Sequence, residues 1–218
     1  MSQILNPNSL DAYDYELPPE LIANFPTFPK EDAKLLIYER ASEKISHLKF
    51  GDLPDILPPC DIIFNDTKVI KARIFGKKQS SGETELLLNS PLADGKFSVY
   101  IKGKVRAGSV LNFDENLTAE VCELFGDGSR TVKFSQNGEL LDTATLYKIL
   151  SRIGHVPLPP YIKRSDTEDD ESWYQSVFAK NEGAVAAPTA SLHFSDEMIA
   201  RLAKDRKIAY PTLLVGAG

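Results

Sequence analysis

Short apolar runs recur along the middle of the chain, between residues 74 and 134, at intervals of roughly ten to fifteen residues. The runs are rich in β-branched and aromatic residues, and glycine-containing turns separate most of them. Short strands at such spacing are typical of a small sandwich or barrel. The pattern predicts a small β-barrel with strands at residues 84–89, 97–102, 109–113, 118–125 and 130–134.

The segments on either side of this region contain further strand patterns. Residues 34–38 and 45–50 predict a hairpin around the polar turn 40–44. Residues 61–65 and 208–215 are each predicted to form one apolar strand.

Helices are predicted from apolar spacing and capping residues. The clearest helix is capped by Asp142 and stopped by Gly154. Its apolar face repeats at i, i+3, i+4 and i+7 through Leu146, Ile149, Leu150 and Ile153. A last helix is predicted to begin after Ser195, and shorter helical segments are expected at residues 17–25 and 173–180.

We therefore expect a mixed α/β fold, with the small β-barrel inserted into a mixed α/β host domain. Residues 1–70 and 140–218 would form the host, and residues 71–139 the barrel. The proline-rich segment 157–160 is interpreted as both a hinge and the rim of a cleft. The acidic run 166–171 is predicted to be a surface loop.

Composition limits the class of protein. Hydrophobic residues make up 42% of the chain and charged residues 26%, as in an ordinary globular protein. No apolar stretch approaches the ~20 residues that span a bilayer, and the first residues lack a signal-peptide pattern. Cys60 and Cys122 lie far apart in sequence, which predicts neither a disulfide framework nor a metal site. We expect a cytoplasmic protein that binds no metal and no membrane.

Charge is unevenly distributed along the chain. The net charge of −6 argues against a protein that coats nucleic acid by charge alone. Residues 68–78 and 96–106 nevertheless carry basic side chains and no acidic ones. Such stretches are either solvated strand positions or contacts to RNA, and the residues favour the two interpretations equally.

Residues 183–194 combine small residues with polar ones, so that a ligand could approach the backbone closely. If this segment is a strand, Thr189, Ser191 and His193 point to one face, while Leu192 and Phe194 point to the other. The alternative is an alanine-rich strand under a helix with a histidine that only packs.

Segments in five places resemble one family in the same order along the chain. They are residues 15–26, 65–76, 154–162, 174–178 and 183–194. The resemblance is to the S-adenosylmethionine:tRNA ribosyltransferase-isomerase family of queuosine biosynthesis, and it implies the same arrangement of a barrel inserted into an α/β domain.

The resemblance also implies a reaction. The ribosyl part of S-adenosylmethionine is moved to 7-aminomethyl-7-deazaguanine in a tRNA anticodon stem-loop, which gives epoxyqueuosine and releases adenine and methionine. S-adenosylmethionine is then a co-substrate and tRNA the partner, and no cofactor is implied.

This chemistry requires a base beside the sulfonium and an acid for the departing adenine. His193, which titrates near neutral pH, is the first choice for either role. Asp66 and Glu182 are the alternates, although both carboxylates could instead cap turns.

Binding roles follow from the same resemblance. Lys68, Lys71 and Arg73 match the basic motif and are expected to hold RNA phosphate. The hydroxyls of Thr189 and Ser191 are candidates to bind ribose or a carboxylate of the substrate. The aromatic candidates for the anticodon side, which could equally be rim packing, are His155 and Tyr161.

The chain departs from the family pattern near its last residue. Family members continue well past Gly218, Leu214 stands where histidine is usual, many relatives have glycine in place of Ser191, and Pro211 interrupts a predicted strand. We expect from these departures the N-terminal portion of a longer enzyme, from a truncated or decaying gene, that is inactive or barely stable alone.

Two other functions remain open at this point. One is a non-catalytic RNA-binding module built on the barrel. The other, which is weaker, is a nucleotide-binding fragment based on the glycines at 216 and 218, which form half of a GxGxxG pattern.

Overall fold

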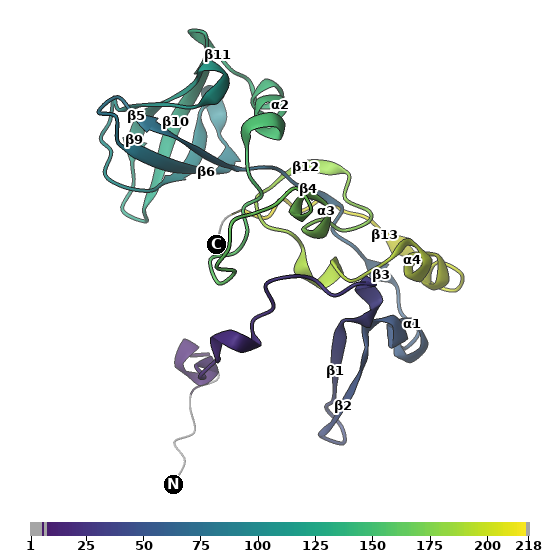
Figure 1. The fold of residues 1–218 in the computed structure, drawn as a ribbon. Coiled ribbons are helices and arrows are strands. Elements are labelled where there is room, and N and C mark those ends of the chain that lie inside the picture. Colours follow the sequence, from purple (N-terminus) through teal and green to yellow (C-terminus); the bar gives the residue numbers. More distant parts are fainter. Residues whose placement is uncertain (1–5, 7, 217–218) are drawn as a thin grey trace.

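The computed structural model describes residues 6 and 8–216, and it consists of a β-barrel beside a host domain of short strands and helices (Figure 1). The α-helices are α1 (Leu53–Ile56), α2 (Thr143–Ile153), α3 (Asp170–Trp173) and α4 (Asp196–Leu202). The strands are β1 (Lys34–Glu39), β2 (Lys44–Lys49), β3 (Ile62–Ile63), β4 (Thr67–Val69), β5 (Arg73–Lys78), β6 (Glu83–Pro91), β7 (Phe97–Ile101), β8 (Val110–Asn112), β9 (Leu117–Leu124), β10 (Ser129–Gln136), β11 (Glu139–Leu140), β12 (Asn181–Ala184) and β13 (Ile208–Ala209). Turns of 3-10 helix occur at Leu10–Tyr13, Pro19–Leu21, Lys30–Asp32, Phe50–Asp52, Ala93–Gly95, Asp114–Asn116 and Thr189–Ser191.

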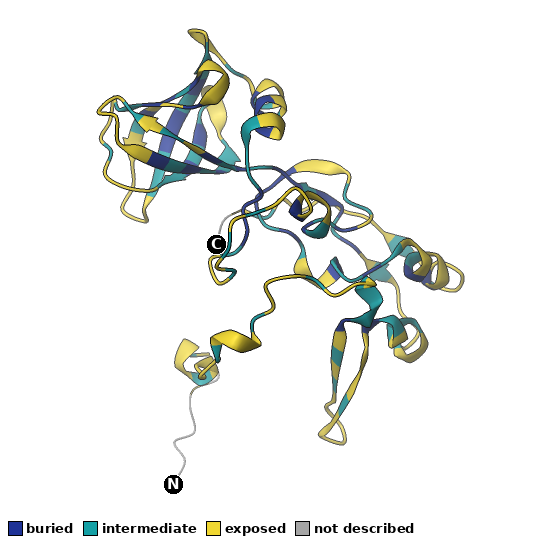
Figure 2. Cartoon of the chain, in the orientation of Figure 1, coloured by how far each residue is buried: buried dark blue, intermediate teal, exposed yellow. Residues whose placement is uncertain are grey.

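The barrel is closed by antiparallel pairing in the order β10, β7, β6, β5, β8, β9 and back to β10. Closure leaves no sheet edge free among these six strands. Leu117, Ala119 and Val121 alternate inward along β9 and are fully buried. Figure 2 shows this alternation as dark blue bands inside the barrel. The predicted barrel is confirmed.

Strand β5 is the barrel strand that the sequence pattern did not reveal. Arg73, Lys77 and Lys78 give this strand a polar character, and Ile74 is its only buried residue. A single inward side chain produces too short an alternation to be recognised.

Helix α2 packs against the barrel and confirms the predicted helix. Leu146, Ile149 and Leu150 are buried in the same apolar cluster as the barrel strands. The Asp142 carboxylate caps the helix, since the Thr145 backbone N–H donates to it at 2.7 Å. The cap at Ser195 is confirmed likewise, because its hydroxyl accepts from the Met198 N–H at 3.3 Å before α4.

The host domain is built from pairs of short strands. The predicted hairpin is confirmed as β1 and β2, and it projects from the body of the molecule (Figure 1). Strand β3 pairs in parallel with β13, and β4 pairs in parallel with β12. Within the described part of the chain, each helix is too short or too polar to cross a membrane.

The predicted strand 208–215 is shorter than expected. Only Ile208–Ala209 is paired as a strand. Beyond it the chain stays close to the host through single contacts, in which the Asp66 N–H donates to the Pro211 carbonyl at 3.1 Å and the Val185 N–H to the Val215 carbonyl at 2.8 Å. Pro211 has no N–H with which to continue a ladder.

Two helix predictions were wrong. Residues 17–25 contain only the 3-10 turn Pro19–Leu21, and the Leu21 side chain is 71% exposed, so its burial does not stabilise a longer helix. Helix α3 runs from Asp170 to Trp173, so it overlaps the predicted helical segment 173–180 only at its first residue. Residues 168, 169 and 171 of the predicted surface loop 166–171 are exposed, but Asp170 is buried, at 2% exposure.

Candidate functional site

A pocket of about 130 Å³ lies where the strands of the host domain meet helix α2, the helix that packs against the barrel. Strand β4 and the residues after it form its floor, with Lys68 and Lys71 among them. Helix α2 contributes Tyr147, and β12 contributes Glu182. The segment around α3 closes the remaining side with Glu171, Tyr174 and Gln175. The pocket therefore draws on several of the segments that the sequence singled out.

Lys68 and Glu182 form an ion pair at the pocket wall. They stand opposite each other in the parallel pairing of β4 and β12. The Lys68 ammonium lies 3.0 Å from the Glu182 carboxylate, and the two side chains are 44% and 50% exposed. Parallel pairing thus brings together a predicted phosphate ligand and a predicted catalytic carboxylate.

Lys71 and Arg73 are also paired with carboxylates. Lys71 contacts Glu171 at the pocket. Arg73 lies outside the pocket, 3.2 Å from Glu85, and donates to the Leu158 carbonyl at 3.3 Å. Each predicted RNA-binding cation therefore has a protein partner.

Two tyrosines border the pocket. Burial raises the pKa of Tyr147, and the negative charge of Glu182 raises it further. Burial likewise raises the pKa of Tyr174. Both phenols therefore remain protonated at neutral pH and available as hydrogen-bond donors.

The pocket floor is fixed by a residue that sequence reasoning did not single out. The Gln175 side chain donates to the Val69 carbonyl at 2.7 Å and accepts from the Val69 N–H at 3.0 Å. This amide occupies the place of a neighbouring strand along β4. Its position inside the motif 174–178 was the only signal in the sequence.

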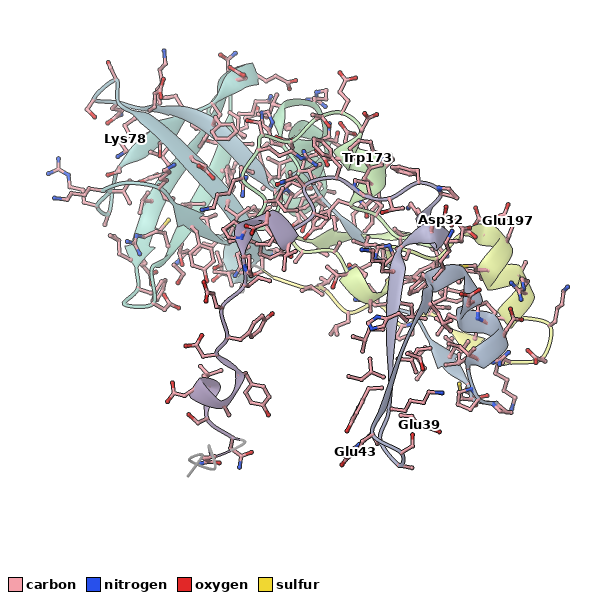
Figure 3. All side chains as sticks on the ribbon, turned by 60° about the horizontal axis from the view of Figure 1, so that its bottom comes forward. Asp32, Glu39, Glu43, Lys78, Trp173 and Glu197 are labelled. Atoms are coloured by element: carbon pink, nitrogen blue, oxygen red, sulfur yellow. The ribbon has the colours of Figure 1, made fainter. Side chains whose placement is uncertain are left out.

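A buried ion pair holds α3 in place and was also missed. Arg164 donates to both Asp170 carboxylate oxygens, at 2.6 and 2.7 Å. The Arg164 guanidinium lies 4.6 Å from the ring centre of Phe25, and Trp173 packs against Phe25 with 6.3 Å between ring centres. Figure 3 labels Trp173 between the barrel, where Lys78 is labelled, and the end of the host where Glu197 is labelled. These contacts attach the N-terminal segment to the pocket wall.

His155 lies on the connection between barrel and host and does not itself line the pocket, although the next residue, Val156, does. Its Nδ1 is 3.0 Å from the Asp166 carboxylate, whose other oxygen accepts from the Val156 N–H at 2.9 Å. The ring packs edge-on against Phe75. His155 is therefore oriented by a carboxylate, while Tyr161, the other candidate for the anticodon side, is 53% exposed.

The prediction that residues 189–193 alternate along a strand was wrong. Thr189–Ser191 form a 3-10 turn. The Ser191 hydroxyl is buried and donates to the Pro188 carbonyl at 2.7 Å, whereas Thr189 is exposed. Pro188 and the short hydroxyl side chain favour a turn over an extended strand.

His193 follows this turn and does not line the pocket. Its ring packs against Phe50 with 5.3 Å between ring centres. Burial lowers the pKa of His193, and the charge of Lys30 lowers it further. The imidazole is therefore neutral at pH 7 and able to accept a proton.

Asp66 is buried where three segments of the host meet. Its carboxylate accepts from the Thr212 hydroxyl at 2.6 Å and from the Asn181 amide at 3.1 Å. Its backbone carbonyl accepts from the N–H groups of Lys180 and Asn181. These contacts give Asp66 a structural role in joining strands.

Leu214, at the position where the resemblance led us to expect histidine, lies beside the pocket wall. Gly183 has a φ of +139°, and a Cβ there would be 3.1 Å from the Leu214 side chain and 3.6 Å from the Tyr147 hydroxyl. The departure from the family pattern therefore borders the site.

Comparison with known proteins agrees with the motifs. A model of the queuosine biosynthesis protein family matches residues 10–218. The S-adenosylmethionine:tRNA ribosyltransferase-isomerase of Campylobacter fetus is 62% identical over 210 residues, which are 96% of this chain and 62% of the relative. That of Aliarcobacter butzleri is 52% identical over 99% of this chain and 64% of the relative.

Among the solved structures that match this chain is one similar enzyme. The S-adenosylmethionine tRNA ribosyltransferase of Thermotoga maritima is 27% identical, with 93% of this chain and 58% of that chain covered and a TM-score of 0.35. This chain spans only part of the length of its relatives, 62% in the case of the Campylobacter fetus enzyme. On the match of the family model to residues 10–218, the chain belongs to the queuosine biosynthesis protein family.

Proposed function

We propose that this chain carries the ribosyl transfer of queuosine biosynthesis. S-adenosylmethionine would donate its ribosyl part to 7-aminomethyl-7-deazaguanine in the anticodon stem-loop of tRNA, in the cytoplasm and without a further cofactor. The observation that carries the proposal is the 62% identity with the Campylobacter fetus enzyme across 96% of this chain.

The catalytic roles are part of this proposal. His193 is the proton acceptor or donor, since burial keeps its imidazole neutral. Glu182 and Asp66 are the alternates, and of these Glu182 lines the pocket. Arg73, His155 and Tyr161 would face the tRNA from the connection between the domains.

A chimera tests the function of this chain in the context of a complete relative. Residues 10–218 replace the matching segment of the Campylobacter fetus protein, and adenine release from S-adenosylmethionine is measured with tRNA that carries the aminomethyl base. We expect release that depends on both substrates. A chimera that unfolds cooperatively but releases no adenine, beside an active parent, would refute the proposal.

Two variants of the chimera test the catalytic role. His193→Gln should lower the rate at least about 100-fold, the usual contribution of general acid–base catalysis. His47→Gln, on the exposed hairpin, is the matched control and should leave the rate unchanged. If the His193 variant binds tRNA and keeps full turnover, another group is the base.

A further inference from the structure

We propose that the pocket at the junction binds the amino-acid end of S-adenosylmethionine, that is, the α-ammonium and α-carboxylate of its methionine half. The inference rests on the proposed function and assigns one part of that substrate to one place in the chain. It rests on the charges that line the pocket, on its volume and on its two tyrosines.

The pocket is lined by two ammonium groups and three carboxylates, and each of these groups has a partner of opposite charge. Two ammonium groups face two carboxylates, and they are paired as Lys68 with Glu182 and Lys71 with Glu171. The remaining lining carboxylate, Asp170, is held by Arg164. A phosphate site would present an excess of cationic donors. Ion pairs of both signs, without an excess of cations, match a ligand that carries one charge of each sign.

The ion pairs can be exchanged for contacts to a ligand. The Lys68 and Glu182 side chains are about half exposed, at 44% and 50%. Solvent-exposed pairs of this kind are weak, because water screens the two charges. A zwitterion that offers a carboxylate to Lys68 and an ammonium to Glu182 replaces both partners, so that no charge is left uncompensated.

The size of the pocket decides which half of the substrate enters. The volume of about 130 Å³ is close to that of a cavity that holds benzene, about 150 Å³. An amino-acid end fills this space, whereas adenine with ribose is larger and would extend beyond it. The adenosine half would then remain outside the pocket, where adenine can depart after the glycosidic bond breaks.

The aromatic side chains complete the recognition. The hydroxyl of Tyr147 remains protonated near the Glu182 charge, so it can donate to the ligand's carboxylate. Tyr147 and Tyr174 both line this space, and an aromatic ring is a favourable neighbour for a sulfonium cation.

Titration calorimetry on the 218-residue chain tests this assignment with two ligands. S-adenosylmethionine has the amino-acid end, and 5′-methylthioadenosine lacks it. In Lys68→Met and Glu182→Gln we expect affinity for S-adenosylmethionine to fall roughly tenfold or more, because a charge-assisted hydrogen bond is lost. Affinity for methylthioadenosine should change less than about twofold. Lys71→Met, from the other pair, provides an independent variant.

The matched control is the exposed pair of Lys96 and Glu123 on the barrel, 3.3 Å apart. Lys96→Met and Glu123→Gln should affect neither ligand. Urea unfolding of each variant confirms that all retain the fold.

The opposite outcomes are distinct. Equal losses for both ligands would place the adenosine half in the pocket and overturn the inference. Unchanged affinity for S-adenosylmethionine in the three pocket variants would also overturn it, while adenine release by the chimera would still support the proposed function. Failure of the unaltered chain to bind S-adenosylmethionine would overturn the inference as well, and the chimera assay decides separately on the function.

Discussion

Arg73 and His155 exchange backbone hydrogen bonds where the chain enters and leaves the barrel. The His155 N–H donates to the Arg73 carbonyl at 2.8 Å, and the Arg73 N–H donates to the His155 carbonyl at 3.3 Å. The two connections between host and barrel are thus held side by side as one antiparallel bridge. Because of this bridge, Gly154 on one connection lies close to the backbone of Lys71 on the other.

Gly154 should not tolerate a side chain. A Cβ at this position would lie 2.2 Å from the Lys71 carbonyl oxygen and 2.5 Å from that of Leu150. Both obstacles are backbone atoms that cannot rotate away. We expect Gly154→Ala to lower the free energy of unfolding by about 3 kcal/mol, at the upper end of the cost of overpacking. Urea denaturation measures it.

Gly126→Ala is the control for this prediction, because a Cβ there meets nothing within 4 Å. Its effect should stay within about 1 kcal/mol. Equal unfolding midpoints for the two variants would contradict the prediction, because they would show that the backbone around residue 154 shifts to accommodate a methyl group.

Asp170→Asn should destabilise the chain by about 2–4 kcal/mol, since it leaves the guanidinium of Arg164 buried without its counter-charge. The side chains of the pair are only 17% and 3% exposed. Asp169→Asn, an identical change at an exposed neighbour, should cost less than about 0.5 kcal/mol. Thermal unfolding of both variants compares them, and similar melting temperatures would contradict the prediction.

The stability of the chain should depend on pH through His193. Its pKa in the folded state lies below the ordinary value of about 6.5. Below pH 6.5 the unfolded chain therefore binds more protons at this position than the folded one. The free energy of unfolding should be highest above pH 6.5 and fall as the pH is lowered toward the folded pKa.

His193→Gln should remove this contribution and flatten the curve of unfolding free energy against pH below 6.5. His47→Gln, at an exposed position, should leave the curve as it is. The measurement is denaturant unfolding at a series of pH values. An unchanged slope in the His193 variant would assign the pH dependence to other groups.

Arg73→Met tests contact with tRNA. If Arg73 holds a phosphate, affinity falls several-fold for any tRNA sequence, and the slope of log affinity against log salt decreases by about 1. Filter binding at several salt concentrations measures both quantities. Lys44→Met on the distant hairpin is the control. An unaltered salt slope for Arg73→Met would mean that its guanidinium serves only Glu85 and Leu158.

The fold was predictable where local patterns extend over several residues. The alternation along β9 and the capped, amphipathic helix α2 both follow from residues close together in sequence. Strand β5 and the turn Thr189–Ser191 were not predictable in this way, because one buried residue or three small residues do not define a period.

The site was predictable in its residues but not in their partners. Motifs pointed to Lys68 and Glu182, yet their pairing depends on the register of two strands that are separated by 114 positions. Gln175 supports the pocket through hydrogen bonds to Val69, a residue far away in sequence. Asp170 supports it through a buried ion pair, and its position in an acidic run gave no indication that it is buried.

The bridge between Arg73 and His155 also has a consequence for the origin of the architecture. Because entrance and exit lie one hydrogen-bonded pair apart, a tight turn from 73 to 155 would reconnect the host without displacing any of its strands. Such a layout lets a whole module be acquired, or exchanged for another, in a single insertion event. The barrel is therefore a natural candidate for transplantation between scaffolds.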